Sequence, residues 1–446
     1  HTLPPLVDPE WLSTPAGERG LLLEYYPNPR LAGPPSLSSV IRRTDLSWFG
    51  TVNPHVDPNS FSLRLTGRLT APEDGTYELH LWAIGQVRLT LGETVLVDTW
   101  TEGDQDQHTC ELHLAGGVPQ DIVLEYGINV ELRWRTVRLG LNRKSVADPI
   151  AEAVAMAADA DIAVVVAGFT SDTETEGMDR PSMRLPGQQD ELIARVAEAN
   201  ANTVVVLTAG CAVQMPWLDR VAAVLQSWYG GQDGGTAIAA VLFGDVSPSG
   251  RLPITIPRRI EDNPSYLNYP GENGRVLYGE HIFAGYRYYD HKDIAPLFPF
   301  GHGLSYAVFE YRNLRMSAEN WGPGADLSVS VDIRNNGAIA AAEVVQLYVR
   351  DVASRIVRPK RELKAFAKVV VEPGETVSVK LQLTPQSLAY FDTARGNWIV
   401  EPGDFVLEVG RSSRDIRQEA RVTWVDPSFQ PLTEIDDPRQ VFGSPD

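Results

Sequence analysis

The order of hydrophobic and polar residues divides the chain into three segments of different character. From residue 19 to 140, short runs alternate hydrophobic and polar positions and are separated by turn sequences such as EDG, IG and GET. Alternation over a few residues is typical of strands that bury one face. The first segment is therefore predicted to be an all-β domain, a meander or sandwich.

From residue 141 to 308 the pattern changes to helices alternating with strands. The stretches VADPIAEAVAMAADA and GQQDELIARVAEAN have helical periodicity, whereas DIAVVVAG and NTVVVLTAG are continuous apolar runs. Continuous runs are typical of parallel strands that are covered on both faces. The second segment is therefore predicted to be an α/β sandwich with a doubly wound, flavodoxin-like parallel sheet.

From residue 309 to 425 the strict alternation returns, with turns at NNG, EPGE and EPGD. About seven such strands in this length predict an immunoglobulin-like or fibronectin-like sandwich. Residues 1–18 are predicted to be a linker, and residues 426–446, rich in Pro and Asp, a C-terminal tail. The chain is thus expected to be a multidomain protein, as its 446 residues also indicate.

Charge and composition narrow the classes of ligand. The formal net charge is −19, with 58 acidic and 39 basic residues, and a field of that sign disfavours nucleic acid and anionic membranes as partners. No apolar run approaches the roughly 18 residues of a membrane span. Cys110 and Cys211 fall in different predicted domains and are expected to be free thiols, and no zinc-type spacing is present. Neither a metal nor an organic cofactor is expected.

The acidic stretch TSDTETEGMDR, residues 170–180, is the strongest candidate for chemistry. It lies in a connection of 18 residues, 169–186, where α/β units ordinarily use roughly 2 to 6. It also follows the carboxyl end of a predicted strand, where open α/β sheets place ligand sites. A calcium loop is disfavoured because Met183 stands at the position that needs a bidentate carboxylate. A catalytic carboxyl and a hydrogen-bonded or solvated loop both remain open. If the loop is extended, Asp172, Glu174 and Glu176 project on one side.

Four stretches of the second segment stand out as motifs, namely TETEGMDRPSMRLPGQQDELI, QSWYGGQDGGTAIAAVLFGDVSPSGRLPITIP, VLYGEHIFAGYRYYD and FPFGHGLSY. They resemble segments of glycoside hydrolase family 3, the β-glucosidase and β-xylosidase family. The first segment resembles a PA14 domain, which some members of the family carry as an insertion in the α/β-sandwich domain. The third segment resembles the fibronectin-III-like domain of the family.

The resemblance implies a retaining β-glucosidase that removes terminal non-reducing β-D-glucosyl residues from small glycosides. Glu176 matches the acid/base of the family's E-G-x-D-R motif, with Glu174 as runner-up because the repeated T-E-T-E permits a two-residue slip. Asp179 and Arg180 match the rest of the motif, where they are expected to fix the loop. The alternatives are a β-xylosidase of the same family and a non-catalytic carbohydrate-binding or adhesion protein.

The nucleophile that the family requires has no match in this sequence. In the family this aspartate lies in an amino-terminal (β/α)8 barrel, within an S-D-W-like segment, and neither occurs here. A separate chain or fragment is therefore expected to carry the barrel and the nucleophilic Asp, and a homo-oligomer of the complete enzyme is left open. Trp217, Trp228 and Tyr229 are predicted to be core residues rather than sugar contacts. Trp100 is expected to be an exposed aromatic residue and is a candidate to border the aglycone.

Overall fold

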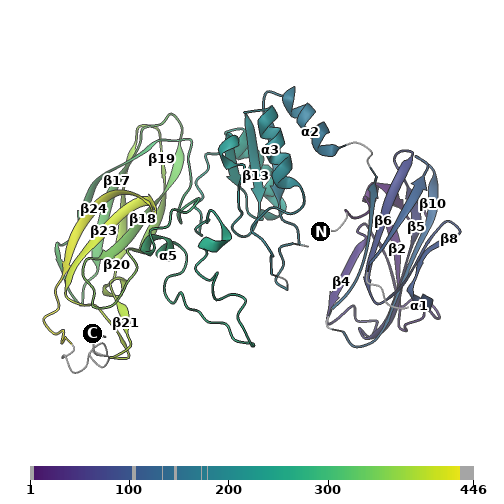
Figure 1. The fold of residues 1–446 in the computed structure, drawn as a ribbon, viewed down its shortest axis with the longest axis horizontal. Coiled ribbons are helices and arrows are strands. Elements are labelled where there is room, and N and C mark those ends of the chain that lie inside the picture. Colours follow the sequence, from purple (N-terminus) through teal and green to yellow (C-terminus); the bar gives the residue numbers. More distant parts are fainter. Residues whose placement is uncertain are drawn as a thin grey trace, which may run out of the picture. The chain divides into compact units, whose positions relative to one another are not determined.

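The computed structural model describes residues 5–102, 107–132, 134–144, 148–171, 173–177 and 179–431 (Figure 1). The chain divides into two compact units, His1–Ala155 and Met156–Asp446. None of the helices in the described ranges is long and apolar enough to cross a membrane.

The first unit is built from two antiparallel sheets. The larger has the order β3-β2-β5-β10-β7-β8, with β1 paired to β5, and the smaller has the order β4-β11-β6-β9. The larger sheet contains β1 Leu12–Ser13, β2 Leu21–Tyr26, β3 Leu37–Ile41, β5 Ser60–Thr70, β7 Gln86–Leu91, β8 Thr94–Asp98 and β10 Pro119–Asn129. The smaller contains β4 Asp45–Phe49, β6 Gly75–Ile84, β9 Gln107–Leu114 and β11 Trp134–Arg143. Two short helices, η1 Pro9–Trp11 and α1 Thr99–Glu102, flank these strands.

The core of this unit forms where alternate residues of the two sheets face each other. Leu79 and Leu81 of β6 and Leu63 and Leu65 of β5 are almost completely buried, as the alternation in the sequence predicts. The segment 5–18 belongs to the same core, because Val7 is buried and β1 pairs with β5. The prediction of a linker over residues 1–18 is therefore corrected for the part that the structure describes. Strand β11 also continues to Arg143, past the predicted boundary at residue 140.

The α/β part of the second unit contains a parallel sheet with the order β12-β13-β14. Its elements are α2 Pro149–Ala158, β12 Ala163–Gly168, α3 Gln189–Ala199, β13 Thr203–Thr208, η2 Leu218–Arg220, β14 Ala223–Gln226, η3 Gly231–Asp233 and α4 Gly234–Leu242. Helix α3 packs on β12 and β13, and residues 163, 165 and 167 of β12 are buried. On the opposite face Val164 and Val166 are 49% and 69% exposed. The prediction that this strand is covered on both faces is therefore wrong for the described chain.

The rest of the second unit is a β-sandwich joined to the α/β part by a largely irregular segment. Its sheets have the orders β15-β17-β20 and β16-β24-β23-β18-β19, with a separate β21-β22 hairpin. The strands are β15 Phe309–Met316, β16 Asn320–Trp321, β17 Leu327–Asn335, β18 Ala341–Asp351, β19 Glu362–Val371, β20 Thr376–Leu383, β21 Tyr390–Asp392, β22 Asn397–Ile399, β23 Gly403–Ser412 and β24 Asp415–Trp424. The short helices are η4 Ile260–Asp262, α5 Tyr286–His291 and η5 Pro385–Ser387. The strands from Phe309 to Trp424 thus form a β-sandwich, the class of fold that the alternation predicts for this part of the chain.

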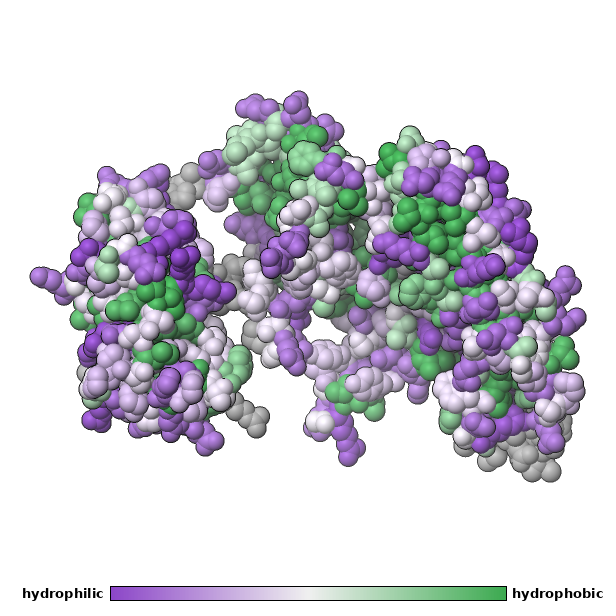
Figure 2. Space-filling model, turned by 180° about the vertical axis from the view of Figure 1, so that it is seen from behind, coloured by the Kyte–Doolittle hydropathy of each residue, from purple (hydrophilic) through white to green (hydrophobic). Residues whose placement is uncertain are grey.

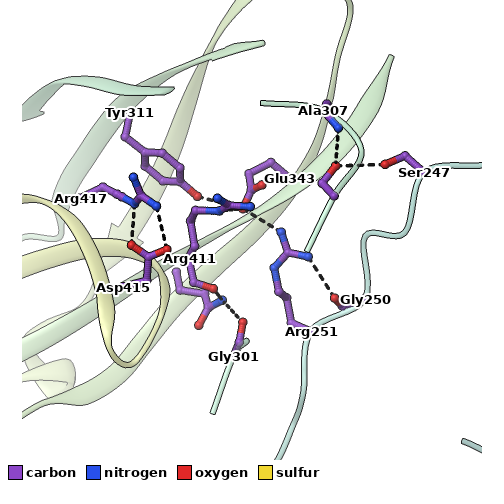
Figure 3. Close-up of polar contacts among 12 residues, drawn as sticks. Ser247, Gly250, Arg251, Gly301, Ala307, Tyr311, Glu343, Arg411, Asp415 and Arg417 are labelled. Carbon is purple, nitrogen blue, oxygen red and sulfur yellow. Dashed lines mark hydrogen bonds and ion pairs between the residues drawn. The ribbon is translucent and has the colours of Figure 1, made fainter. Parts of the chain in front are cut away.

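A buried cluster of charges fixes the irregular segment to the sandwich (Figure 3). Arg251 donates to the Glu343 carboxylate over 2.9 Å, and the side chains of this pair are 6% and 0% exposed. Tyr311 donates to the same carboxylate oxygen over 3.0 Å, and Arg411 lies 3.7 Å from it. Nearby, the Gln346 amide donates to the carbonyl of Gly301 over 3.1 Å. A segment with little regular backbone pairing is thus held by side chains.

Replacing Glu343 with Ala is expected to lower the free energy of unfolding by about 3–5 kcal/mol, because two arginines then lose their buried counter-charge. Guanidinium unfolding of the whole chain measures the change. Asp404→Ala is the matched control, since its pair with Arg421 lies at the surface of the same sandwich and is expected to contribute at most about 1 kcal/mol. Equal effects of the two substitutions would contradict the structural role of Glu343.

Candidate active site

The acidic loop leaves the sheet at the carboxyl end of β12 and returns at the start of α3. A Cβ at Gly168 would lie 1.9 Å from the carbonyl oxygen of Thr208, so only glycine permits this approach to the end of β13. Gln189, at the start of α3, accepts from the Gly168 N–H over 2.7 Å and donates to the Gly168 carbonyl over 2.9 Å. One amide side chain thus joins both ends of the loop.

Glu174 attaches the loop to the ends of the neighbouring strands. Its Oε2 accepts a hydrogen bond from the Gly210 N–H over 2.8 Å and another from the Tyr229 hydroxyl. Gly210 follows β13 and Tyr229 follows β14. The Glu174 side chain is only 13% exposed. The carboxylate therefore joins the carboxyl ends of all three parallel strands.

Arg180 braces the same region from the other end of the acidic stretch. Its Nη2 donates to the Ala212 carbonyl over 2.8 Å, and its Nη1 lies 3.7 Å from Glu174 Oε1. The guanidinium carbon lies 4.5 Å from the centre of the Phe169 ring, which is within range of a cation–π contact. Arg180 thus contacts Glu174, Phe169 and the segment that follows β13.

These contacts determine the charge of the Glu174 carboxyl. Burial raises its pKa, but hydrogen bonds from Tyr229, the Gly210 N–H and Cys211, together with the Arg180 charge, outweigh burial and leave the pKa below its usual value of 4.5. Burial and the hydrogen bond to Glu174 raise the pKa of Tyr229 to about 12. Burial, followed by the Glu174 carboxylate, raises the pKa of the Cys211 thiol. Near neutral pH the group is an ionised carboxylate beside neutral Tyr and Cys donors.

Glu176 has a different environment, although it is only two residues away. It is exposed, and within the described chain no hydrogen bond or ion pair engages its carboxylate. A Cβ built on the adjacent Gly177 would meet no atom within 4 Å. The stretch is not extended, because the N–H groups of Thr173 and Glu174 both bond to the Thr170 carbonyl and Glu176 itself lies in a turn. The expectation that 174 and 176 project alike therefore fails, while Asp172 lies outside the described residues.

The other residues that the sequence singled out lie either beside the acidic loop or in the core. Asp179 is exposed and accepts a hydrogen bond from Tyr269. Trp217 is a core residue, 1% exposed, and its indole donates to Asp190 over 2.9 Å. Tyr229 is not core, because it is 53% exposed and binds Glu174. Its role follows from its position just after a parallel strand, a signal that the sequence contained.

A hollow of about 710 Å³ lies beside the loop. Arg180, Met183 and Cys211 line one side, and Pro253 and Tyr286 contribute to the rest. Among the described residues, no three His, Cys, Asp or Glu side chains lie close enough together to hold a metal ion. The arrangement offers an exposed carboxyl, an anchored carboxylate and a guanidinium at one edge of a parallel sheet, a set suited to proton transfer.

Comparison with protein families identifies matching models for most of the second unit and part of the first. The family model described as the glycosyl hydrolase family 3 C-terminal domain matches residues 49–306. A fibronectin type III-like domain matches residues 343–413. The probable beta-glucosidase I of Aspergillus terreus is 39% identical over 430 residues, covering 90% of this chain and 51% of that protein. The thermostable beta-glucosidase B of Acetivibrio thermocellus is 46% identical over 306 residues, covering 69% and 39%.

Solved structures are similar as well. The beta-glucosidase of Kluyveromyces marxianus in complex with glucose matches with a TM-score of 0.88 and 34% identity, over 96% of this chain and 53% of that one. DesR, a beta-glucosidase of Streptomyces venezuelae in complex with D-glucose, matches with a TM-score of 0.61 and 36% identity, over 81% and 46%. The chain spans about half the length of the relatives it matches.

The Glu174 anchor predicts a pH-dependent effect of Glu174→Gln. Because the folded-state pKa is lowered, the ionised carboxylate stabilises the fold above pH 4.5, and this contribution is lost as the pH falls through the lowered pKa. At pH 7 the free energy of unfolding of the variant is expected to be about 1–2 kcal/mol lower than that of the parent chain. Denaturant unfolding of both proteins from pH 7 to pH 3 measures the difference, which is expected to shrink below pH 4.5.

Glu191→Gln serves as the control, because Glu191 lies half-exposed on α3 and its one ion pair within the described residues is with Arg195, at 3.4 Å. It is expected to show no comparable change with pH. A Glu174→Gln defect that grew as the pH fell would show that Glu174 is not held as an anion.

Proposed function

Because this chain belongs to glycosyl hydrolase family 3, we propose that it provides the proton-transfer half of a retaining β-glucosidase. The substrate class is small glycosides with a terminal, non-reducing β-D-glucosyl residue. The observation that carries the proposal is the acidic loop, which presents an exposed Glu176 at the carboxyl edge of the sheet while Glu174 is held. No cofactor enters this chemistry.

In the proposed mechanism Glu176 protonates the glycosidic oxygen as the aglycone leaves, and then removes a proton from the attacking water. Glu176 suits this role because its carboxyl has no protein partner among the described residues. Glu174 suits it poorly, since its protonated form is disfavoured by three hydrogen-bond donors and by the charge of Arg180. Glu174 and Arg180 therefore position the loop, and the contact between Asp179 and Tyr269 supports its far end.

Retaining hydrolysis requires a second carboxyl about 5–5.5 Å from the first. In this proposal a nucleophilic aspartate on a (β/α)8 barrel, carried by a separate chain or fragment, supplies it. An exposed apolar face of the α/β part supports the proposal that a partner covers it. Val164 and Val166 of β12 are exposed, and the apolar helix α4 has no buried residue. Hydrophobic residues gather on this part of the surface in Figure 2, and contiguous apolar patches of this kind mark interaction sites.

Glucose is proposed as the sugar because two related enzymes are described in complex with it. A β-xylosidase of the same family is the rival specificity, and comparing turnover of aryl glucosides with that of xylosides separates the two. We also propose that the two-sheet sandwich of the first unit is a PA14-like domain. Its support is the two-sheet antiparallel sandwich, to which the stretch that resembles such a domain contributes β2, β5, β6, β7 and β8.

Replacing Glu176 with Ala is expected to lower kcat for glycosides with poor leaving groups by about 10²–10⁴-fold, the usual contribution of a general acid. Activated leaving groups such as dinitrophenol need little protonation, so their glycosylation step is expected to change far less. Added azide is expected to restore turnover, since it attacks the glycosyl intermediate without a general base. The assay uses this chain mixed with a barrel-bearing partner.

Glu174→Ala is the comparison variant. It is expected to lower the turnover of all these substrates by a similar factor, and azide is not expected to restore it. If Glu174→Ala shows the leaving-group dependence and the rescue while Glu176→Ala is nearly silent, the assignment of the two residues is reversed. If the complete pair binds sugar but hydrolyses none of these substrates, the non-catalytic binding protein replaces the enzyme.

The covering partner can be tested through Val166→Lys on β12. Burying a lysine against a partner is costly, so about tenfold more partner is expected to be needed for half-maximal activity. The thermal unfolding of the chain alone is expected to stay unchanged, because Val166 is already exposed. Val425→Lys, at a valine of the sandwich that is 46% exposed, is the matched control. Equal partner requirements for both variants would exclude this face as the contact.

A further inference from the structure

Residues 263–283, which we call the arm, connect η4 to α5 and contain no helix or strand (Figure 1). The arm nevertheless has a defined shape. At its tip Glu272 and Arg275 exchange both backbone hydrogen bonds, over 3.0 and 2.9 Å. Nearer its base, a Cβ at Gly279 would lie 2.9 Å from the side-chain nitrogen of Asn268, so the two limbs of the arm touch there. Long connections without regular structure are usually functional.

The arm exposes apolar side chains that have no core to enter. None of its residues is buried, and among its seven large exposed apolar side chains Leu267, Tyr278 and Leu277 are 92%, 78% and 72% exposed. The others are Tyr266, Tyr269, Val276 and Ile282. These side chains contribute little to the stability of this chain, because much of their surface remains in water. Exposed apolar groups that gather on one segment mark a surface that binds another molecule.

The charge on the arm indicates the kind of partner. Its ionised side chains are two glutamates and one arginine, namely Glu272, Glu280 and Arg275. It therefore has no basic cluster that would attract nucleic acid or an anionic membrane. Tyrosine is enriched in the cores of protein interfaces, where charged residues are depleted, and three of the seven exposed side chains are tyrosines. The arm fits an apolar patch on another protein.

Two features place the arm beside the acidic loop. The Tyr269 hydroxyl donates a hydrogen bond to the Asp179 carboxylate, and Asp179 follows Glu176 by three positions. At the base of the arm, Asn263 lines the same hollow as Arg180. Retaining hydrolysis requires a nucleophilic carboxyl about 5–5.5 Å from the acid/base, so the protein that supplies it must cover the acidic loop. Because the arm is bonded to that loop, the same partner meets the arm.

We propose that the arm is a docking element for the partner that carries the nucleophile, and that the contact between Tyr269 and Asp179 couples docking to the position of the acidic loop. The proposal rests on the function proposed above and adds a defined contact surface to it. Leu277 and Tyr278 provide binding, whereas Tyr269 is a positioning residue. The two roles lie on different residues and can be separated by substitution.

The binding role is tested by co-expressing this chain with the part of the Kluyveromyces marxianus enzyme that it does not cover. Dissociation of the purified pair on dilution, followed by analytical ultracentrifugation, gives the dissociation constant. Leu277→Ser and Tyr278→Ser are each expected to raise it about tenfold or more, because each removes an apolar group from the contact. The thermal unfolding of the chain alone is expected to stay unchanged, since both residues are exposed.

Phe366→Ser is the matched control, because this phenylalanine lies 67% exposed on β19 of the sandwich. It is expected to leave the dissociation constant of the pair unchanged. Arm variants that bind like the parent, in a pair that still hydrolyses glucosides, would overturn the inference and leave the proposed hydrolysis standing. Binding that depends on Tyr278, in a pair that hydrolyses no glycoside, would refute only the enzyme.

The positioning role is tested by Tyr269→Phe, which removes only the hydroxyl. The dissociation constant is expected to stay within about twofold of that of the parent pair. In contrast, kcat for glucosides with poor leaving groups is expected to fall about tenfold with unchanged KM, because Glu176 is less well placed to donate its proton. Dinitrophenyl glucosides need little protonation and are expected to change less.

Asp179→Ala is expected to give the same loss of kcat as Tyr269→Phe, and the double variant no further loss, since both substitutions remove one contact. Additive losses, or an unchanged kcat in Tyr269→Phe, would show that this contact does not couple docking to the loop. Two further results would overturn the docking role itself. One is a parent chain that forms no complex with the co-expressed part. The other is sedimentation with phosphatidylcholine vesicles that is lost in Leu277→Ser, which would place the arm on a lipid surface.

Discussion

The carboxylate of Glu174 is the contact on which the arrangement of the candidate site depends. One oxygen accepts hydrogen bonds from groups that follow β13 and β14, and the residue itself follows β12. A connection of 18 residues with little regular structure would otherwise have many conformations, and ordering it costs entropy. A buried, ionised hydrogen-bond acceptor offsets part of that cost. It also explains why two acidic residues so close in sequence have different environments.

A second buried carboxylate, that of Glu343, fixes the irregular segment to the sandwich in a similar way. Glu343 gathers Arg251, Arg411 and Tyr311 around one buried carboxylate, where the irregular segment has few backbone ladders. Buried charges add little net stability compared with apolar packing, but removing one partner is costly. Such a cluster therefore favours one geometry over neighbouring ones. In both places a single carboxylate joins parts of the chain that backbone hydrogen bonding alone would leave free.

The sequence was sufficient for the order of the domains and for the location of the loop, because both follow from local periodicity and from connection length. The sequence was not sufficient to predict the environments of side chains that depend on contacts between distant parts of the chain. The alternate positions of the acidic stretch predicted one shared side, but Glu174 is bonded to Gly210 and Tyr229 whereas Glu176 is exposed. The continuous apolar run of β12 predicted cover on both faces, and one face is exposed. The position of Tyr229 just after a parallel strand marked it as a candidate for the site, but its pairing with Glu174, 55 positions away, is a long-range contact that local patterns do not specify.

The exposed face of β12 and the exposed carboxyl of Glu176 are connected by one physical requirement. A carboxyl that donates a proton near neutral pH needs burial or a neighbouring negative charge. Glu176 has solvent around it in this chain, whereas a barrel that covers the edge of the sheet would supply an apolar surrounding and the nucleophilic carboxylate together. In the proposed enzyme, assembly would therefore do more than bring two residues within reach. It would create the electrostatic environment in which Glu176 acts as an acid, while Glu174, already ionised and held by its own donors, keeps the loop in place.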